Sequence, residues 1–424
     1  MILTHIKSIF AVKSLKTKII ATLLLVLVYK MLSVIPLPGA NTAGLQAIID
    51  QQKGLSLFSA LMGGGLSHFS VILMGLSPYI NAVIIIQLLG VIIPKIGDMQ
   101  KEGEAGQRKV NKITRWLTLP LAFLQSYGMI LLLNNLAKGT IIDMMNWHVV
   151  LFAMIVVTAG TIFLMWLGEI MTEYGIGNGI SIIIMAGVLG GVPGVIFNYI
   201  SIGNYPLFAA VLIATLFIIY VIIKFTEGNR RIPIIYTKTG REEKSYFPIR
   251  INQAGMIPII FAISLVTFPG IVGQIMSNST APQTKAIGTW LLQFFSMQNP
   301  SWIFIIVYFI FVLIFSFFYV SITFNTEQVS ESIQKRGGYI PGIRPGTETA
   351  DYLARVSSHL NLFGGGFLAF IAVLPYILEK VVSSSQKVDF LISGAGLIIL
   401  VSTILDLIRK VDSEMKMFDY SKYK

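Results

Sequence analysis

The sequence predicts an all-α polytopic membrane protein of ten transmembrane helices, arranged as two pseudo-symmetric inverted five-helix halves plus a plug-like half-helix. Three observations predict it. The 424 residues are 54% hydrophobic and only 12% charged, whereas a soluble chain carries about twice that charge. Apolar runs of about 20 residues recur, which is the length that a helix needs to cross a bilayer. Lys and Arg concentrate in alternate loops.

Ten apolar segments are long enough to be crossings. The first follows a Lys-rich stretch without a small-residue cleavage site, which favours a retained span over a removed signal peptide. The expected spans are 19–38, 69–93, 117–136, 149–168, 178–199, 207–225, 254–276, 301–324, 356–378 and 390–408.

The distribution of basic residues orients these spans. With the N-terminus inside, 26 of the 32 Lys and Arg residues fall in inner segments and five in outer ones. The positive-inside rule therefore predicts that both termini are cytoplasmic. The net charge of +12 is then mostly cytoplasmic, where it suits anionic lipid or an acidic partner such as RNA.

The chain divides into an N-terminal half, 1–200, with spans one to five, and a C-terminal half, 201–424, with spans six to ten. Because each half holds an odd number of spans, the second half enters the membrane from the opposite side. That order is typical of an inverted repeat, whose interface usually holds the functional path. No residue-level repeat is visible, so this prediction depends on the span order alone.

The apolar segment 55–94 is broken in the middle by Gly63, Gly64 and Gly65. A short apolar piece precedes the break, and the span that follows carries Asn81 and Gln87. Lipid offers the backbone no hydrogen-bond partners, so a half-helix at membrane depth has to be buried in protein or line a cavity. This segment predicts a pore, a binding site or a stopper.

Two long cytoplasmic loops stand out. Residues 226–251 alternate apolar and polar residues around a Thr-Gly turn, which predicts a β-hairpin. Residues 325–351 have a short helical pattern followed by Gly and Pro turns around Arg344. Topology alone explains their positive charge but not this rigid frame around one arginine.

The chain offers little for catalysis. It has no cysteine and only four scattered histidines, whereas a zinc site needs clustered ligands. No nucleophile elbow, metalloprotease motif or phosphate-binding loop is present. The acidic residues Glu169, Glu379 and Asp406 all lie at span ends, where solvation is easy. We therefore expect no enzyme activity, no cofactor and no metal.

Aliphatic pairs one helical turn apart occur beside a helix-loosening Pro or Gly in three spans. Residues at i and i+4 share a helix face, and aliphatic faces that meet at a constriction gate by dewetting. The same spacing also fits side chains that face lipid or pack in the bundle. The pairs are Leu76 with Ile80, Ile180 with Ile184, and Met256 with Ile260.

Seven stretches, in order along the chain, resemble signature sequences of the SecY family, the channel subunits of the bacterial protein translocase. They are Ser33–Gly39 (SVIPLPG), Leu76–Leu89 (LSPYINAVIIIQLL), Glu102–Glu104 (EGE), Gly175–Ile184 (GIGNGISIII), Arg230–Ile234 (RRIPI), Asn252–Pro258 (NQAGMIP) and Pro341–Gly346 (PGIRPG).

The resemblance implies two halves hinged like a clamshell around an hourglass pore. It implies a plug at about 55–65 that closes the outer funnel, with Leu57, Phe58, Leu61, Met62, Gly63 and Gly64. It also implies a pore ring of Leu76, Ile80, Ile180, Ile184, Ile260 and Ile399. Leu76 stands where isoleucine is common in the family and keeps the apolar character.

The second and third spans against the seventh and eighth would form a lateral gate lined by Asn81, Gln87 and Gln125. Arg230, Arg231 and Arg344 match loop positions that such channels present to ribosomes and to a motor.

The implied function is a protein-conducting channel. It would pass unfolded secretory polypeptides across the bacterial cytoplasmic (inner) membrane and release transmembrane segments sideways into it. The implied partners are the SecE and SecG membrane subunits, the SecA ATPase, the ribosome, signal-peptide-bearing preproteins and anionic lipids.

Two other classes remain open from the residues. A secondary transporter also uses broken helices and inverted repeats, but it needs polar ligands near the bilayer midplane, and these are sparse here. A membrane-embedded enzyme needs a catalytic pair, and the spans offer none.

Overall fold

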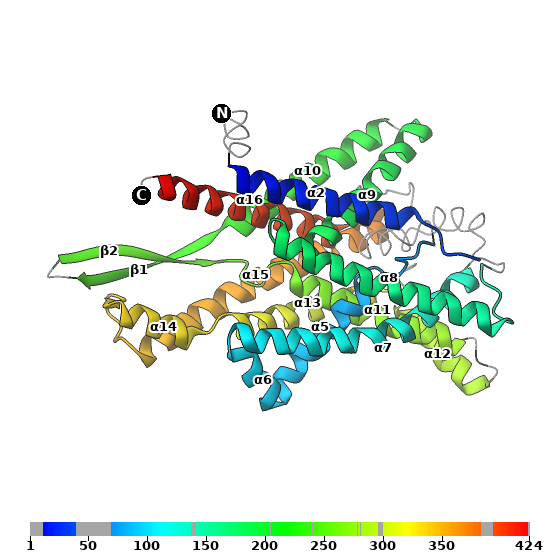
Figure 1. Ribbon diagram of the computed structural model, residues 1–424, viewed down its shortest axis with the longest axis horizontal. Coiled ribbons are helices and arrows are strands. Elements are labelled where there is room, and N and C mark those ends of the chain that lie inside the picture. Colours follow the sequence, from blue (N-terminus) through cyan, green and yellow to red (C-terminus); the bar gives the residue numbers. More distant parts are fainter. Residues whose placement is uncertain are drawn as a thin grey trace.

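The protein is a bundle of long helices with one small sheet projecting from an end (Figure 1). The computed structural model describes residues 12–39, 69–136, 141–203, 205–238, 241–277, 279, 281–295, 300–382 and 393–422. The plug residues expected from the sequence, including Leu57, Phe58, Leu61, Met62, Gly63 and Gly64, lie outside this part.

The long helices mostly follow the long axis of the molecule (Figure 1). They are α2 (Lys13–Val34), α5 (Ser77–Ile92), α7 (Glu104–Leu136), α8 (Trp147–Tyr174), α9 (Gly179–Ile202), α10 (Tyr205–Glu227), α11 (Ile257–Ser277), α13 (Trp302–Thr323), α15 (Thr347–Val382) and α16 (Gly394–Lys422). Three shorter helices are α6 (Pro94–Lys101), α12 (Pro282–Phe295) and α14 (Thr326–Lys335).

This architecture is that of an all-α polytopic membrane protein. Within the described ranges, 7 helices are long and apolar enough to cross a membrane, or up to 8 if the bent pair α5 and α6 counts as one span. Each of the ten predicted spans coincides with one long helix. Two of the ten long helices fall outside this count of 7 or 8. They are α11, whose apolar part Ile257–Gly270 is shorter, and α16, which carries Asp406, Arg409 and Lys410.

The second span differs from the prediction. We expected a full-length crossing over 69–93, but residues 69–76 form turns and the helix begins only at Ser77. The chain also bends by 112° between α5 and α6, because Pro94 cannot continue the hydrogen-bond ladder of α5. The helical part of this span is 16 residues long.

The predicted hairpin is confirmed as β1 (Asn229–Lys238) and β2 (Arg241–Arg250). A third strand, β3 (Gly338–Tyr339), was not predicted and pairs antiparallel with β1 at Ile235 and Tyr236. Since β3 follows the predicted short helix α14, the sheet joins the two long loops into one unit. We call the end of the bundle that bears this sheet the hairpin end.

The helix α12 was also not predicted, since its segment reads as an outer loop. It folds back against α11 at the end opposite the hairpin (Figure 1). Glycines permit this close approach: a Cβ atom on Gly288 would lie 2.4 Å from the backbone nitrogen of Ser277.

Candidate functional site

The largest hydrophobic cluster joins most of the long helices. It brings together all six aliphatic residues that were expected to form a ring. Leu76, Ile184 and Ile399 are buried in it, and Ile80, Ile180 and Ile260 are partly buried and pack against it. These residues come from the start of α5 and from α9, α11 and α16, so four segments far apart in the sequence meet in one apolar region.

The glycine-rich turn before α9 sets the position of Ile180. The Asn178 side chain accepts a hydrogen bond from the Ile180 amide at 3.0 Å and so caps the helix. Gly177 has a φ of +81°, which a side chain would strain. A Cβ atom on Gly175 or Gly179 would lie 2.4 or 2.2 Å from carbonyl oxygens of α8. Each small residue of this motif is therefore needed to seat α9 against α8.

A second turn positions Ile260 on α11. The Asn252 side chain accepts a hydrogen bond from the amide of Gly255 at 2.9 Å, and Gly255 has a φ of +65°. The turn directs Met256 toward α16, where the Thr403 hydroxyl lies 3.6 Å from its sulfur. Ile260 follows one turn later, and its amide bonds to the Met256 carbonyl.

The chain before and after the predicted plug is joined at one place. The Leu37 amide donates to the Phe69 carbonyl at 2.8 Å, and the Val71 amide donates to the Ile35 carbonyl at 3.1 Å. Phe69 is almost completely buried and has a φ of +47°, a strained conformation for a bulky residue. This junction fixes the first turn of the second span against α2.

The helices that we expected to form a gate pack together. α5 contacts both α7 and α11, and α7 also contacts α11. Asn81 is partly buried on α5. The side-chain oxygens of Gln87 on α5 and Gln125 on α7 are buried and have no hydrogen-bond partner among the described residues. A buried unpaired polar group costs about 1–3 kcal/mol, so each of these two amide oxygens lowers the stability of the packed helices.

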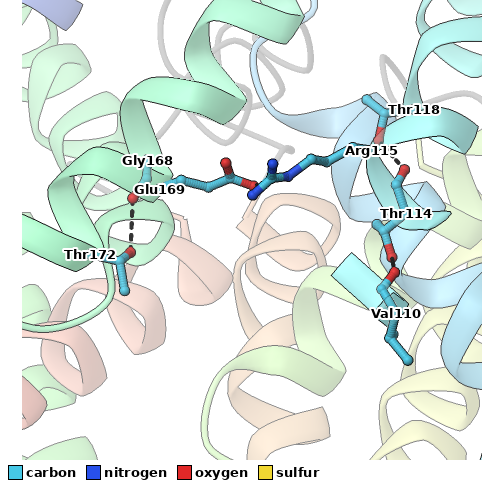
Figure 2. A network of polar contacts seen from close by, with 7 residues as sticks. All are labelled: Val110, Thr114, Arg115, Thr118, Gly168, Glu169 and Thr172. Atoms are coloured by element: carbon cyan, nitrogen blue, oxygen red, sulfur yellow. Dashed lines mark hydrogen bonds and ion pairs between the residues drawn. The ribbon is translucent and has the colours of Figure 1, made fainter. Parts of the chain in front are cut away.

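An ion pair that sequence reasoning missed connects α7 to α8 (Figure 2). The Arg115 Nε donates to the Glu169 carboxylate at 2.8 Å. The nearby hydroxyl of Thr114 donates back to the Val110 carbonyl within α7. Because the arginine side chain is 52% exposed, the pair adds at most about 1 kcal/mol. The sequence showed Glu169 at a span end but did not reveal its partner, because Arg115 lies 54 residues away along the chain.

Arg230 and Arg231 are both exposed on β1. Successive strand residues point to opposite faces of a sheet. Ile232 and Ile234 are buried in the cluster that packs against α15, so Arg230 is on the face toward α15 and Arg231 on the other. One flat partner surface would therefore not contact both in the same way.

Arg344 is presented by a rigid turn. Its side chain is 87% exposed and lies 3.8 Å from Glu348. The Thr349 hydroxyl donates to the Arg344 carbonyl at 2.9 Å, and the Ser330 hydroxyl donates to the Gly346 carbonyl at 2.7 Å. The frame of prolines and glycines therefore holds one arginine out from the hairpin end.

No group of three or more His, Cys, Asp or Glu side chains that could hold a metal ion occurs within the described ranges. The expectation that the protein needs no cofactor stays a prediction.

The fold defines a polytopic membrane protein whose long helices meet in one apolar cluster. The model of the SecY family matches residues 70–408. The chain therefore belongs to the SecY family. It is 37% identical to the protein translocase subunit SecY of Halalkalibacterium halodurans over 99% of both chains. It is 34% identical to that of Haemophilus influenzae, over 96% of this chain and 93% of the relative.

Solved structures show the same fold. A protein-conducting channel superposes with a TM-score of 0.66 at 19% identity, covering 94% of this chain and 92% of that chain. The Sec61 channel in a canine ribosome–channel complex from the endoplasmic reticulum superposes with a TM-score of 0.63 at 20% identity, with the same coverage.

Proposed function

We propose that the chain passes unfolded secretory polypeptides across the bacterial cytoplasmic membrane and releases transmembrane segments sideways into it. As a member of the SecY family, the chain is a protein-translocation channel. The observation that carries the finer proposal is the large apolar cluster, in which the six aliphatic residues expected to form a ring meet from four segments of the chain.

The aliphatic residues suit a channel whose cargo has no fixed chemistry. Leu76, Ile80, Ile180, Ile184, Ile260 and Ile399 would form the ring around the pore. A ring of aliphatic side chains excludes water, and with it ions, by dewetting. It offers no hydrogen bond that would hold one polypeptide better than another.

The segment at about 55–65 is proposed as the plug. Three consecutive glycines lower the cost of swinging it, since glycine restricts the backbone least. The junction of Ile35 and Leu37 with Phe69 and Val71 supports this role, because it anchors the chain on both sides of the segment.

The lateral gate would lie between α5 and α7 of the half 1–200 and α11 and α13 of the half 201–424. Asn81, Gln87 and Gln125 line it in this proposal. The contact of α11 with both α5 and α7 supports it. A hydrophobic segment would leave through this seam into lipid.

Both termini and the hairpin end would face the cytoplasm, in agreement with the positive-inside rule. Arg230, Arg231 and Arg344 are proposed to contact the SecA motor or the ribosome there, and small SecE-like and SecG-like subunits would complete the complex. The chain itself would supply no energy and catalyse no reaction.

Reconstitution tests the proposal. The chain with its small membrane partners is placed in liposomes with the motor, ATP and a signal-bearing precursor. We expect the precursor to become protected from added protease, and protection to require both ATP and the signal. Uptake of a small solute without any protection of the precursor would instead favour the secondary transporter.

A further inference from the structure

The two proposed halves contact each other on two sides of the molecule. On one side α11 lies against α5 and α7, and this is the proposed gate. On the other side α16 and α10 both lie against α9, and we call these contacts the α9 side. In Figure 1, α2 and α16 run along the upper side of the molecule and α5 and α7 along the lower side. A gate that opens therefore needs contacts elsewhere that hold the halves together.

At the hairpin end, the first long helix is joined to the last (Figure 1). The Lys18 Nζ donates to the Glu414 carboxylate at 2.6 Å, and the two side chains are 36% and 20% exposed. Next to this ion pair, an apolar cluster combines side chains from the start of α2, from the turn before α9 and from α16. Its members are Val12, Leu15, Ile19, Ile176, Leu407, Val411, Met415 and Phe418. We call the ion pair and this cluster the clasp.

The clasp is continuous with the turn that positions Ile180. The amide of Ile176 in this turn donates to the Thr22 hydroxyl of α2 at 3.1 Å. A Cβ atom on Gly177 would lie 3.0 Å from a methyl carbon of Leu407, so α16 packs directly on the turn. The start of α2, the turn with α9, and α16 therefore form one connected unit. It carries three of the six residues of the proposed ring, which are Ile180, Ile184 and Ile399.

Helix α9 links the clasp to a second place where the proposed halves are joined. The clasp lies at the beginning of α9. At the other end, α9 ends at Ile202 and the chain continues into α10, which begins at Tyr205 in the other half. The 24 residues of α9 separate these two places by about 36 Å. Two points at which the halves are held together define an axis of rotation between them.

The two sides also differ in how their polar groups are paired. On the gate side, the amide oxygens of Gln87 and Gln125 are buried and have no hydrogen-bond partner among the described residues. In the clasp, Lys18 pairs with Glu414, and the Thr22 hydroxyl both accepts a hydrogen bond and donates one to the Lys18 carbonyl at 2.9 Å. Leaving a buried polar group without a partner costs free energy that a paired group does not. The gate side is therefore the easier one to separate.

From this arrangement we infer that the two halves rotate about an axis along α9, with the clasp as the pivot at the hairpin end. Atoms close to an axis of rotation move little, so Ile180 and Ile399 stay together. Ile80 and Ile260 lie on the helices of the gate and move apart, so the ring opens on one side only. The inference rests on the proposed function, because it concerns how the proposed channel opens.

Cross-linking tests whether the clasp stays closed during transport. The chain contains no cysteine, so in the variant Lys18→Cys/Glu414→Cys a short bis-maleimide can react only at the two introduced thiols and join α2 to α16. Intact mass shows that both thiols have reacted. In liposomes with the motor, ATP and a signal-bearing precursor, we expect the cross-linked channel to import as well as the same variant before cross-linking, because a pivot does not have to separate.

Charge reversal tests whether the clasp is needed. Lys18→Glu and Glu414→Lys each place like charges side by side. Each should make the resting channel conduct small ions in a planar bilayer, because the ring residues on α9 and α16 lose their fixed spacing. The exchange Lys18→Glu/Glu414→Lys restores the pair and should restore the seal. Glu331→Lys breaks an exposed ion pair within α14 and is the matched control, which should stay silent. Thermal melts of all variants establish that they are folded.

Three results would overturn the inference. They are loss of import on cross-linking, silent bilayers with both single reversals, and a leak that the exchange does not repair. Failure of the proposed function looks different, because the double-cysteine channel and the wild type would then import no precursor before any reagent is added. The conductance measurement contains no precursor, so it tests the clasp in either case.

Discussion

Ile80 and Ile260 contribute to the central cluster from two different helices, α5 and α11, and both are only partly buried there. Leu76, Ile184 and Ile399, which are proposed for the same ring, are buried in this arrangement of the helices. The sealing role proposed for Ile80 and Ile260 depends on their apolar character rather than on a specific contact.

Replacing Ile80 or Ile260 with Asn should make the resting channel conduct small ions, because an amide side chain wets a constriction that was closed by dewetting. Planar-bilayer conductance of the purified channel measures this. Ile80→Leu and Ile260→Leu keep the apolar surface and should stay silent. Silent bilayers with both Asn variants would exclude these residues from the seal.

Arg344→Glu should block motor- or ribosome-driven transport and leave the fold intact. The side chain is highly exposed, so the stability change should stay within about 0.5 kcal/mol. The reversed charge, however, would repel an acidic partner surface. Import of a signal-bearing precursor into proteoliposomes is the readout. Lys335→Glu on α14 also reverses the charge of an exposed side chain at the hairpin end. It serves as the control, and the variant should import the precursor normally. If the Arg344→Glu variant imports the precursor like the wild type, Arg344 contributes only to the orientation of the spans in the membrane.

At the scale of elements, a junction holds together the described residues on the two sides of the predicted plug. Leu37 and Phe69 hold the two sides of the chain together by a backbone hydrogen bond. Val71 lies against α8 at Gly160, where a Cβ atom would approach its carbonyl oxygen to 2.1 Å. Changes between these anchor points should therefore disturb the helices little.

Deleting residues 57–65 should leave a folded channel that still translocates but leaks ions transiently. Precursor import and ion conductance are measured on the same mutant. A carrier would behave differently, because its broken helix forms the substrate site. Loss of import without any leak would therefore contradict the plug and favour the carrier.

Gly288→Leu should destabilise the packing of α12 on α11 by about 1–3 kcal/mol, the usual cost of overpacking a close contact. The added side chain would meet backbone atoms of α11, which cannot move aside as a flexible side chain would. Chemical denaturation reports the loss. Gly366→Leu on α15 is the matched control, because a Cβ atom there meets nothing within 4 Å. Equal stability of the two variants would show that α12 is not tightly packed.

At the scale of the whole molecule, the two proposed halves meet where α11 contacts α5 and α7. In the gate proposed here, the amide oxygens of Gln87 and Gln125, which have no hydrogen-bond partner among the described residues, would make the closed seam less stable than an apolar one. A gate that has to open for a passing segment opens more readily when its closed form is slightly less stable.

Gln87→Leu and Gln125→Leu should each stabilise the closed seam by about 1–3 kcal/mol by removing a buried unpaired group. We expect a higher melting temperature together with slower import, most of all for precursors with weakly hydrophobic signals. Leu88→Met on α5 preserves the volume and should change neither quantity. Faster import by the glutamine variants would contradict a gating role for the seam.

The sequence by itself determined the membrane class, the approximate positions of the long helices other than the start of α5, the hairpin and the short helix α14. Hydrophobic periodicity, turn residues and charge act over short distances along the chain, so they can be read from the sequence. The family resemblance pointed to the six aliphatic residues, whose spacing alone also fitted lipid-facing positions.

Only the tertiary structure decided which of these local features meet. Ile80 and Ile399 lie more than 300 residues apart, and their shared cluster depends on how α5, α9, α11 and α16 pack. The late start of α5 follows from the pairing of Phe69 and Val71 with residues next to α2. The strand β3 is only two residues long and exists because β1 offers it an edge. Such features have no local signal, because their stability comes from partners distant in the sequence.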